Sequence, residues 1–180
     1  MNLRDSVQIA LLLGIGALLH VITPPIFAGM KPDPSLGMLF IVVLLKRDFR
    51  SVVLAGLVAA VLGALTGSAG MQVANLIDKF FTTLIVFTFL VKPLYGRIND
   101  KVLSGILGFI GTLISGTIFL SVGIYLLGFD LGASFGLLFS TIVLPTAAFN
   151  TVVTLVLYPI VLFSKGVVDR NSSQEAIVKK

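Results

Sequence analysis

The chain has 180 residues, of which 57% are hydrophobic and 12% charged, and its mean hydropathy is +1.09. An average soluble domain contains roughly 25% charged residues, so this composition excludes an ordinary soluble protein and indicates one that lives in a bilayer. Cysteine is absent, which excludes disulfides, thiolate nucleophiles and Cys-ligated metals. The net charge of +5 is spread over the short connections between apolar runs, where it reports membrane topology and gives no reason to expect a nucleic acid partner.

Six apolar segments predict an all-α transmembrane fold with six helices, because a spanning helix needs about 20 apolar residues. The segments are residues 6–23, 34–45, 51–67, 71–92, 101–128 and 132–163. The first has no small-residue cleavage site and is followed by further spans, so we expect a retained helix and not a signal peptide. Residues 1–168 therefore form a single transmembrane domain, and residues 169–180 a polar, poorly ordered cytoplasmic tail.

The first segment carries a row of small residues in its cytoplasmic half. Ser6, Ala10 and Gly14 are spaced by four, and such faces let another helix approach closely. Comparable rows occur in the third segment (Ala55, Ala59, Gly63, Gly67) and in the fifth (Gly108, Thr112, Gly116). Spacing alone favours packing within the chain for any one of these faces.

The connection HVITPPIFAGMKPD, residues 20–33, follows the first segment. A charged, proline-rich loop beside apolar helices is costly unless it meets a polar partner, so the loop is a candidate gate over a ligand. We expect Met30 and Lys31 to face inward and Pro32 to stiffen the closure. His20, the only histidine, lies at the outer end of the first helix, where a structural role and ligand contact both remain open.

The second and last segments depart from ideal spans. The second is short and begins at Pro34, whereas the last exceeds thirty residues and contains Pro145 and Pro159. Proline lacks an amide hydrogen and clashes with the preceding turn. We therefore expect these two prolines to kink the last helix or end it early.

The distribution of Lys and Arg predicts the topology. Eleven of the thirteen basic residues fall on one side of the six segments, namely Arg4, Lys46, Arg47, Arg50, Lys92, Arg97, Lys101, Lys165, Arg170, Lys179 and Lys180. The positive-inside rule places that side, with both termini, in the cytoplasm. Only Lys31 and Lys79 lie outside, and each has an acid nearby, Asp33 and Asp78. Local ion pairs at the headgroup level are one explanation.

A polar stripe on the fourth segment favours a second explanation. At 100° per residue its members lie within an arc of about 140°; they are Gln72, Asn75, Asp78, Lys79, Thr82 and Thr83. A lipid-facing Asp or Lys would cost about 2.5–3.5 kcal/mol near the bilayer centre, so the stripe should face protein or a wet cavity. A cavity containing both charges suits a zwitterion such as an amino acid.

The last segment adds Thr146, Asn150 and Thr154 on one helix face below Pro145. Asn150 can bind a ligand donor or form an interhelical hydrogen bond without ligand contact. Phe149, beside it, is a candidate for aromatic stacking.

No phosphate-binding GxxxxGK[ST] loop, HExxH or GxSxG motif occurs. We therefore expect no enzymatic activity, and active transport would need an outside energy source.

Three stretches together resemble the tryptophan transporter family among the substrate-binding S components of energy-coupling factor (ECF) transporters. They are HVITPPIFAGMKPDPSLGMLF from His20, NLIDK from Asn75 and PTAAFN from Pro145. The most specific element is GMKPD at residues 29–33, and the resemblance extends from Ser6 to about Phe163. It implies a six-helix S-component fold in the prokaryotic plasma membrane, with an extracellular loop that closes over the ligand.

The resemblance also implies partners and residue roles. The partners are a transmembrane T component, which would dock on the Ser6, Ala10 and Gly14 face, and two cytoplasmic ATPases that use ATP; this chain needs no cofactor or metal. The expected substrate is L-tryptophan. We expect the substrate-binding residues to be Met30, Lys31, Asp33, Asn75, Asp78, Lys79 and Asn150, and the gate residues to be His20, Pro24, Pro25, Gly29 and Pro32.

Two alternatives stay open at this point. An S component could take another aromatic or vitamin substrate, because spacing and composition do not distinguish these from tryptophan. The chain could also be a structural or regulatory membrane subunit without a ligand.

Overall fold

The computed structural model describes residues 3–24, 32–67, 70–130 and 132–178, and every regular element in these ranges is a helix. The first half contains α1 (Leu3–Ile22), α2 (Pro34–Leu45), α3 (Phe49–Thr66) and α4 (Gln72–Val86), the last continuing through the π-helical η1 (Phe87–Val91) into α5 (Lys92–Leu94). The second half contains α6 (Asp100–Ile106), η2 (Leu107–Gly111), α7 (Thr112–Ser121), η3 (Val122–Leu126), α8 (Phe135–Leu138), η4 (Phe139–Val143) and α9 (Leu144–Val178).

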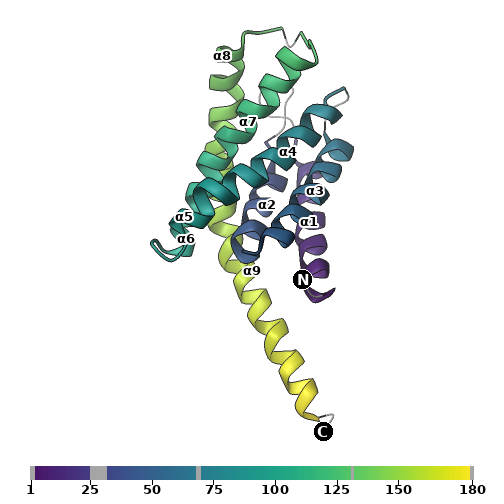
Figure 1. Ribbon diagram of the computed structural model, residues 1–180, viewed down its shortest axis with the longest axis vertical. Coiled ribbons are helices and arrows are strands. Elements are labelled where there is room, and N and C mark those ends of the chain that lie inside the picture. Colours follow the sequence, from purple (N-terminus) through teal and green to yellow (C-terminus); the bar gives the residue numbers. More distant parts are fainter. Residues whose placement is uncertain (1–2, 25–31, 68–69, 131, 179–180) are drawn as a thin grey trace.

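These elements join into six rods that match the six predicted segments (Figure 1). Five rods are long and apolar enough to cross a bilayer: Asp5–Ile22, Phe49–Thr66, Gln72–Leu94, Asp100–Leu126 and Phe135–Gly166. Large apolar side chains are exposed on all five, including Leu18, Leu65, Phe89, Tyr125 and Phe163. Lipid contact explains such exposure. The chain is a multi-pass membrane protein, as its composition predicts.

The remaining helix, α2, forms the centre of the bundle. Its 12 residues extend about 18 Å at 1.5 Å per residue, well short of the roughly 30 Å hydrocarbon core, and ten of them are buried. It packs against α1, α3 and α9. Because α2 is too short to span the bilayer and ten of its residues are buried, it lies inside the bundle, and its start at Pro34 brings Pro32 and Asp33 in with it.

Capping residues fix where several helices begin. Asp33 accepts a hydrogen bond from the Ser35 amide at the start of α2, and Asp48 accepts one from the Ser51 amide at the start of α3. The Ser51 amide stabilises the charged form, so it holds the pKa of the Asp48 carboxyl below its usual value. Asp33 therefore has a local role in starting α2 besides any role in a site.

The prolines of the last rod do not end it. Pro145 follows the π-helical segment η4, and α9 continues through Pro159 to Val178. Of the two expected outcomes, a kink or an early end, the early end does not occur, because a long helix tolerates single missing hydrogen bonds and often absorbs them next to a π-helical turn. The backbone of the predicted tail is likewise helical as far as Val178.

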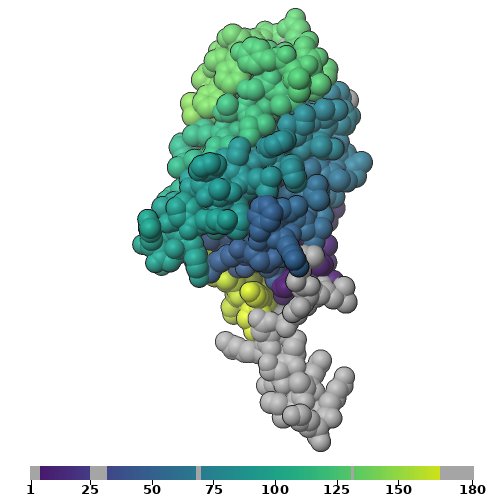
Figure 2. Space-filling view, in the orientation of Figure 1, coloured from purple at the N-terminus to yellow at the C-terminus, as the bar shows by residue number. Residues whose placement is uncertain are grey.

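Both termini lie towards the same end of the bundle, with the α2–α3 and α5–α6 connections (Figure 1). The rods that contain α4 and α7 form a continuous outer wall in the space-filling view (Figure 2). Basic side chains at the terminal end join the elements: Lys46 pairs with Asp5, and Arg47 lies 2.7 Å from Asp100 and 3.5 Å from the centre of the Tyr95 ring. This arrangement agrees with the cytoplasmic placement of these connections.

Candidate ligand-binding site

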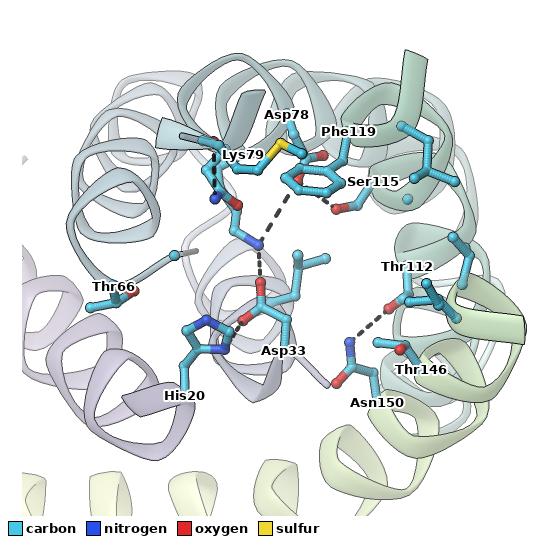
Figure 3. A pocket seen from close by; sticks show the side chains of 18 residues that line it. His20, Asp33, Thr66, Asp78, Lys79, Thr112, Ser115, Phe119, Thr146 and Asn150 are labelled. Atoms are coloured by element: carbon cyan, nitrogen blue, oxygen red, sulfur yellow. Dashed lines mark hydrogen bonds and ion pairs between the residues drawn. The ribbon is translucent and has the colours of Figure 1, made fainter. Parts of the chain in front are cut away.

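A cavity of about 340 Å³ lies among the end of α1, the start of α2, and helices α4, α7 and α9 (Figure 3). Its polar lining residues are His20, Asp33, Thr66, Asn75, Asp78, Lys79, Thr112, Ser115, Thr146 and Asn150. Its apolar lining residues are Leu36, Gly67, Met71, Gly116, Phe119, Leu120, Ile142 and Val143. The volume falls at the lower end of the roughly 300–1,000 Å³ range of small-molecule pockets.

The charged groups of the cavity form one cluster around Lys79. The Lys79 ammonium pairs with the Asp33 carboxylate, and its Nζ lies 3.9 Å from Oδ2 of Asp78. The side chains of Lys79 and Asp78 are only 3% and 2% exposed. Burial at this depth excludes the explanation that Lys79 extends to the headgroup level, and it requires that each charge be compensated inside the protein.

Asp33 connects three elements of the site. Its carboxylate accepts a hydrogen bond from the Ser35 hydroxyl, pairs with Lys79 on α4, and has Oδ1 3.3 Å from Nδ1 of His20 on α1. Burial alone would raise the pKa of Asp33, but Lys79, His20 and these hydrogen bonds outweigh burial and lower the pKa to about 2. Asp33 is thus paired across the bundle with a residue 46 positions away.

Asp78 is held by hydroxyl groups from two helices. Oδ1 accepts from Thr82, one turn later on α4, and Oδ2 accepts from Ser115 on α7, each at 2.8 Å. Thr83 donates to the Lys79 carbonyl and contacts α3 at Gly56, whereas Gln72 is exposed. The stripe predicted on the fourth segment therefore faces protein and cavity from Asn75 onward.

Asn150 lies on α9, on the other side of the cavity from Lys79 (Figure 3). It is fully buried, and its Nδ2 donates to Oγ1 of Thr112 on α7 at 3.0 Å. Thr146 also lines the cavity, whereas Thr154 is buried one turn further along and donates to the Asn150 carbonyl. Of the three residues on this predicted face, Thr146 and Asn150 line the cavity and Thr154 does not.

The predicted gate is described only in part. His20 lines the cavity, Pro32 is buried and Pro24 is exposed. Pro25, Gly29, Met30 and Lys31 lie outside the described residues. The placement of Asp33 and His20 brings both ends of this loop to the cavity.

The apolar wall was not predicted from the sequence. Phe119 lines the cavity, whereas Phe149, the candidate for aromatic stacking, is 37% exposed and does not. Thr112, Ser115 and Phe119 are spaced by three and four residues, so one face of α7 supplies all of them. That spacing is visible in the sequence, but it indicates a binding site only when the structure shows that this face of α7 lies against Asp78 of α4.

The three rows of small residues have different surroundings. Cβ atoms placed on Gly63 of α3 and Gly108 of η2 would lie 3.2 Å from Lys79 and 2.4 Å from Thr154, so these rows pack within the chain. On α1, by contrast, Ala10 is exposed, Ser6 is half-buried, and a Cβ on Gly14 would meet no atom within 4 Å. Among the described residues, the α1 row is open to the surroundings.

Taken together, these contacts place an acidic and basic cluster at one side of a cavity whose remaining wall is largely apolar. Such a cavity can hold a small zwitterion with an apolar side chain, since each charged ligand group finds an opposite charge. Within the described ranges, His, Asp and Glu do not gather in threes as metal ligands would.

Comparison with known proteins gives consistent matches over nearly the whole chain. The family model described as "Tryptophan transporter TrpP" matches residues 2–165. A probable tryptophan transport protein of Clostridium acetobutylicum is 43% identical over 171 residues, which cover 94% of this chain and 98% of the relative. Proteins with the same description from Clostridium perfringens and Bacillus subtilis are 41% and 36% identical, covering 89% and 98% of this chain and 94% and 99% of their own. No solved structure matches significantly.

Proposed function

We propose, from the premise that this chain belongs to the tryptophan transporter TrpP family, that it captures L-tryptophan from outside the cell and delivers it for uptake. The observation that carries the proposal is the buried cluster of Lys79, Asp33 and Asp78 beside an apolar wall. The relatives' description as probable tryptophan transport proteins supports a transport role and no enzymatic one.

The cluster supplies opposite charges for both ends of the amino acid backbone. Lys79 would bind the tryptophan carboxylate, and Asp33 and Asp78 would receive the ammonium group. Asn75 and Asn150 would contribute further polar contacts. The indole would then lie against Met71, Phe119 and Val143, where aromatic and apolar side chains favour burial of a large ring.

Binding would rearrange the connection between α1 and α2. Lys79 already pairs with Asp33, so an incoming carboxylate must share or replace that partner. Because Asp33 also caps the start of α2, a change in its pairing would alter the conformation of the loop from Thr23 to Asp33. We propose that this loop, with His20, Pro24, Pro25, Gly29 and Pro32, closes over the ligand, and that Met30 and Lys31 face it.

The energy for uptake would come from partner subunits of an ECF transporter. This chain has no phosphate-binding loop, so ATP would be used by two cytoplasmic ATPases, joined to this S component through a transmembrane T component. The open row of Ser6, Ala10 and Gly14 on α1 supports docking there, because small residues let a partner helix approach closely.

Uptake of labelled tryptophan tests the function. Cells that need this chain for uptake should lose it when Lys79→Ala is substituted, since Asp33 and Asp78 would remain buried without their cation. Lys92→Ala, at an exposed basic residue outside the cavity, is the matched control. Unchanged uptake by the Lys79→Ala protein at equal membrane levels would favour a subunit without a ligand.

A further inference from the structure

Asn150 carries a buried oxygen that has no partner. The side chain is 0% exposed and lines the cavity, and in the part of the chain that the structure describes its Oδ1 accepts no hydrogen bond. Leaving a buried amide oxygen unpaired is costly, and most such groups in folded proteins are satisfied. A ligand donor at this point would remove the cost.

The hydrogen bonds around Thr112 fix which Asn150 atom is free. A threonine hydroxyl has one hydrogen to donate, and Thr112 donates it to the Gly108 carbonyl at 2.6 Å. Thr112 can then only accept from Asn150, so the amide nitrogen must face Thr112 at 3.0 Å. The amide oxygen is then the atom left without a partner, on a residue that lines the cavity, so a ligand that donates a hydrogen bond there would satisfy it.

We place the donor at the side-chain end of the ligand. Asn150 lies across the cavity from Lys79 (Figure 3), so a ligand whose carboxylate is held by Lys79 can turn its side chain towards Asn150. Ile142, Val143 and Phe119 line the wall of the cavity and offer only apolar contact. Among apolar aromatic side chains, indole has a ring N–H, whereas phenyl has none.

We infer that Asn150 is a specificity-determining residue that accepts a hydrogen bond from the indole N–H of bound tryptophan, with Thr112 holding its amide in the required orientation. The inference rests on the proposed function and deepens it. A site built to receive a substrate N–H rejects analogues that lack it, because the buried acceptor then stays unpaired.

An isosteric analogue tests the inference without altering the protein. In β-(3-benzothienyl)-L-alanine a sulfur replaces the indole N–H while the ring shape is kept. Wild-type protein should bind this analogue on the order of tenfold to a hundredfold more weakly than L-tryptophan. Direct titration with tryptophan, followed by displacement with the analogue, measures both affinities.

A variant assigns the discrimination to Asn150. Asn150→Leu should lower tryptophan affinity towards that of the analogue and leave analogue binding nearly unchanged. Thr151→Val is the matched control, because Thr151 is the next residue on α9 and, among the described residues, its hydroxyl donates to the Ala147 carbonyl of the same helix. This control should keep the wild-type preference.

Equal wild-type affinities for tryptophan and the analogue would overturn the inference, even if Asn150→Leu does not fold. Discrimination that persists in Asn150→Leu, or an equal loss of both ligands, would also overturn it. These results differ from failure of the proposed function, in which wild-type protein binds neither ligand.

Discussion

At the scale of single residues, the site depends on charges that are stable only as a set. Lys79 is buried between two carboxylates, and each carboxylate is in turn bound by hydroxyl groups or a helix start. Removing one partner of a buried pair leaves an uncompensated charge, which costs far more than the net contribution of the intact pair. The residues most important for ligand binding should therefore also be important for stability.

Asp33→Asn should lower the free energy of unfolding by about 3–5 kcal/mol, because Lys79 loses its closest partner in the interior. Thermal unfolding of the purified protein in detergent would measure the change. Asp100→Asn is the matched control, since its pair with Arg47 is about one-third exposed and should contribute only about 0–1 kcal/mol. Equal losses in the two variants would contradict the account.

The lowered pKa of Asp33 has a consequence for acid stability. A carboxyl whose folded pKa is about 2, against an ordinary 3.8, contributes stability that is complete above the ordinary value and is lost as pH falls towards 2. Between pH 7 and pH 5 this group should therefore cause no loss. Comparing the melting temperatures of wild type and Asp33→Asn across this range should give a constant difference, and a difference that shrinks by pH 5 would show that Asp33 or a charged group in contact with it titrates there.

The sequence predicted some of these residues and not others, for physical reasons. A charge in an apolar segment is conspicuous, so Asp78, Lys79 and Asn150 could be found by the cost of burying them. The pairing of Lys79 with Asp33 could not, because it joins residues 46 positions apart. Leu120, Ile142 and Val143 look like any other lipid-facing or core residue until the cavity is seen.

At the scale of elements, the close approach of helices positions the site. A Cβ on Gly108 would lie 2.8 Å from both the Asn150 carbonyl oxygen and the Cα of Thr151, which are backbone atoms of α9. These contacts leave no room for a side chain. Asn150 belongs to this same turn of α9. The close packing of Gly108 against the turn therefore determines where the Asn150 amide lies.

Gly108→Ala should therefore force α9 outward, destabilise the protein by about 1–3 kcal/mol and weaken tryptophan binding. Gly14→Ala is the matched control in another helix: its Cβ meets nothing within 4 Å, and Ala in place of Gly inside a helix stabilises it by up to about 1 kcal/mol. Melting temperatures of both variants, measured with and without tryptophan, check the prediction. A Gly108→Ala protein as stable as wild type would show that the contact can relax.

The existence of the six rods was predictable because apolar runs of spanning length are strong signals. The behaviour of the last rod was not, since Pro145 and Pro159 are compatible with either a helix end or a continuing helix. The burial of α2 inside the bundle was also not predictable from the sequence. Its shortness was visible in the sequence, but only packing against α1, α3 and α9 reveals that it begins inside the bundle.

At the scale of the whole molecule, the proposed docking face on α1 and the ligand cavity are in different places. Ala10 is exposed and a Cβ on Gly14 would meet no atom of the described residues within 4 Å, whereas the α1 residue that lines the cavity is His20, at the other end of the helix. A residue of this row can therefore be enlarged without touching the site.

Gly14→Leu should prevent association with a T component and its ATPases while leaving tryptophan affinity unchanged, because bulk at a small-residue face blocks close helix approach. Co-purification of the complex and ligand titration of the isolated chain measure the two properties separately. Ile15→Ala, at an exposed apolar residue about 100° round the same helix from Gly14, controls for general changes in lipid contact. An intact complex with Gly14→Leu would remove this face as the docking surface.

The most direct test of the account is a fluorescence titration of the purified protein with L-tryptophan. The chain contains no tryptophan and only three tyrosines, so the ligand's own indole reports its burial. We predict a saturable change at micromolar ligand that disappears in Lys79→Ala while Lys92→Ala retains it. The absence of a saturable change with folded wild-type protein would contradict the claim that this cavity holds tryptophan.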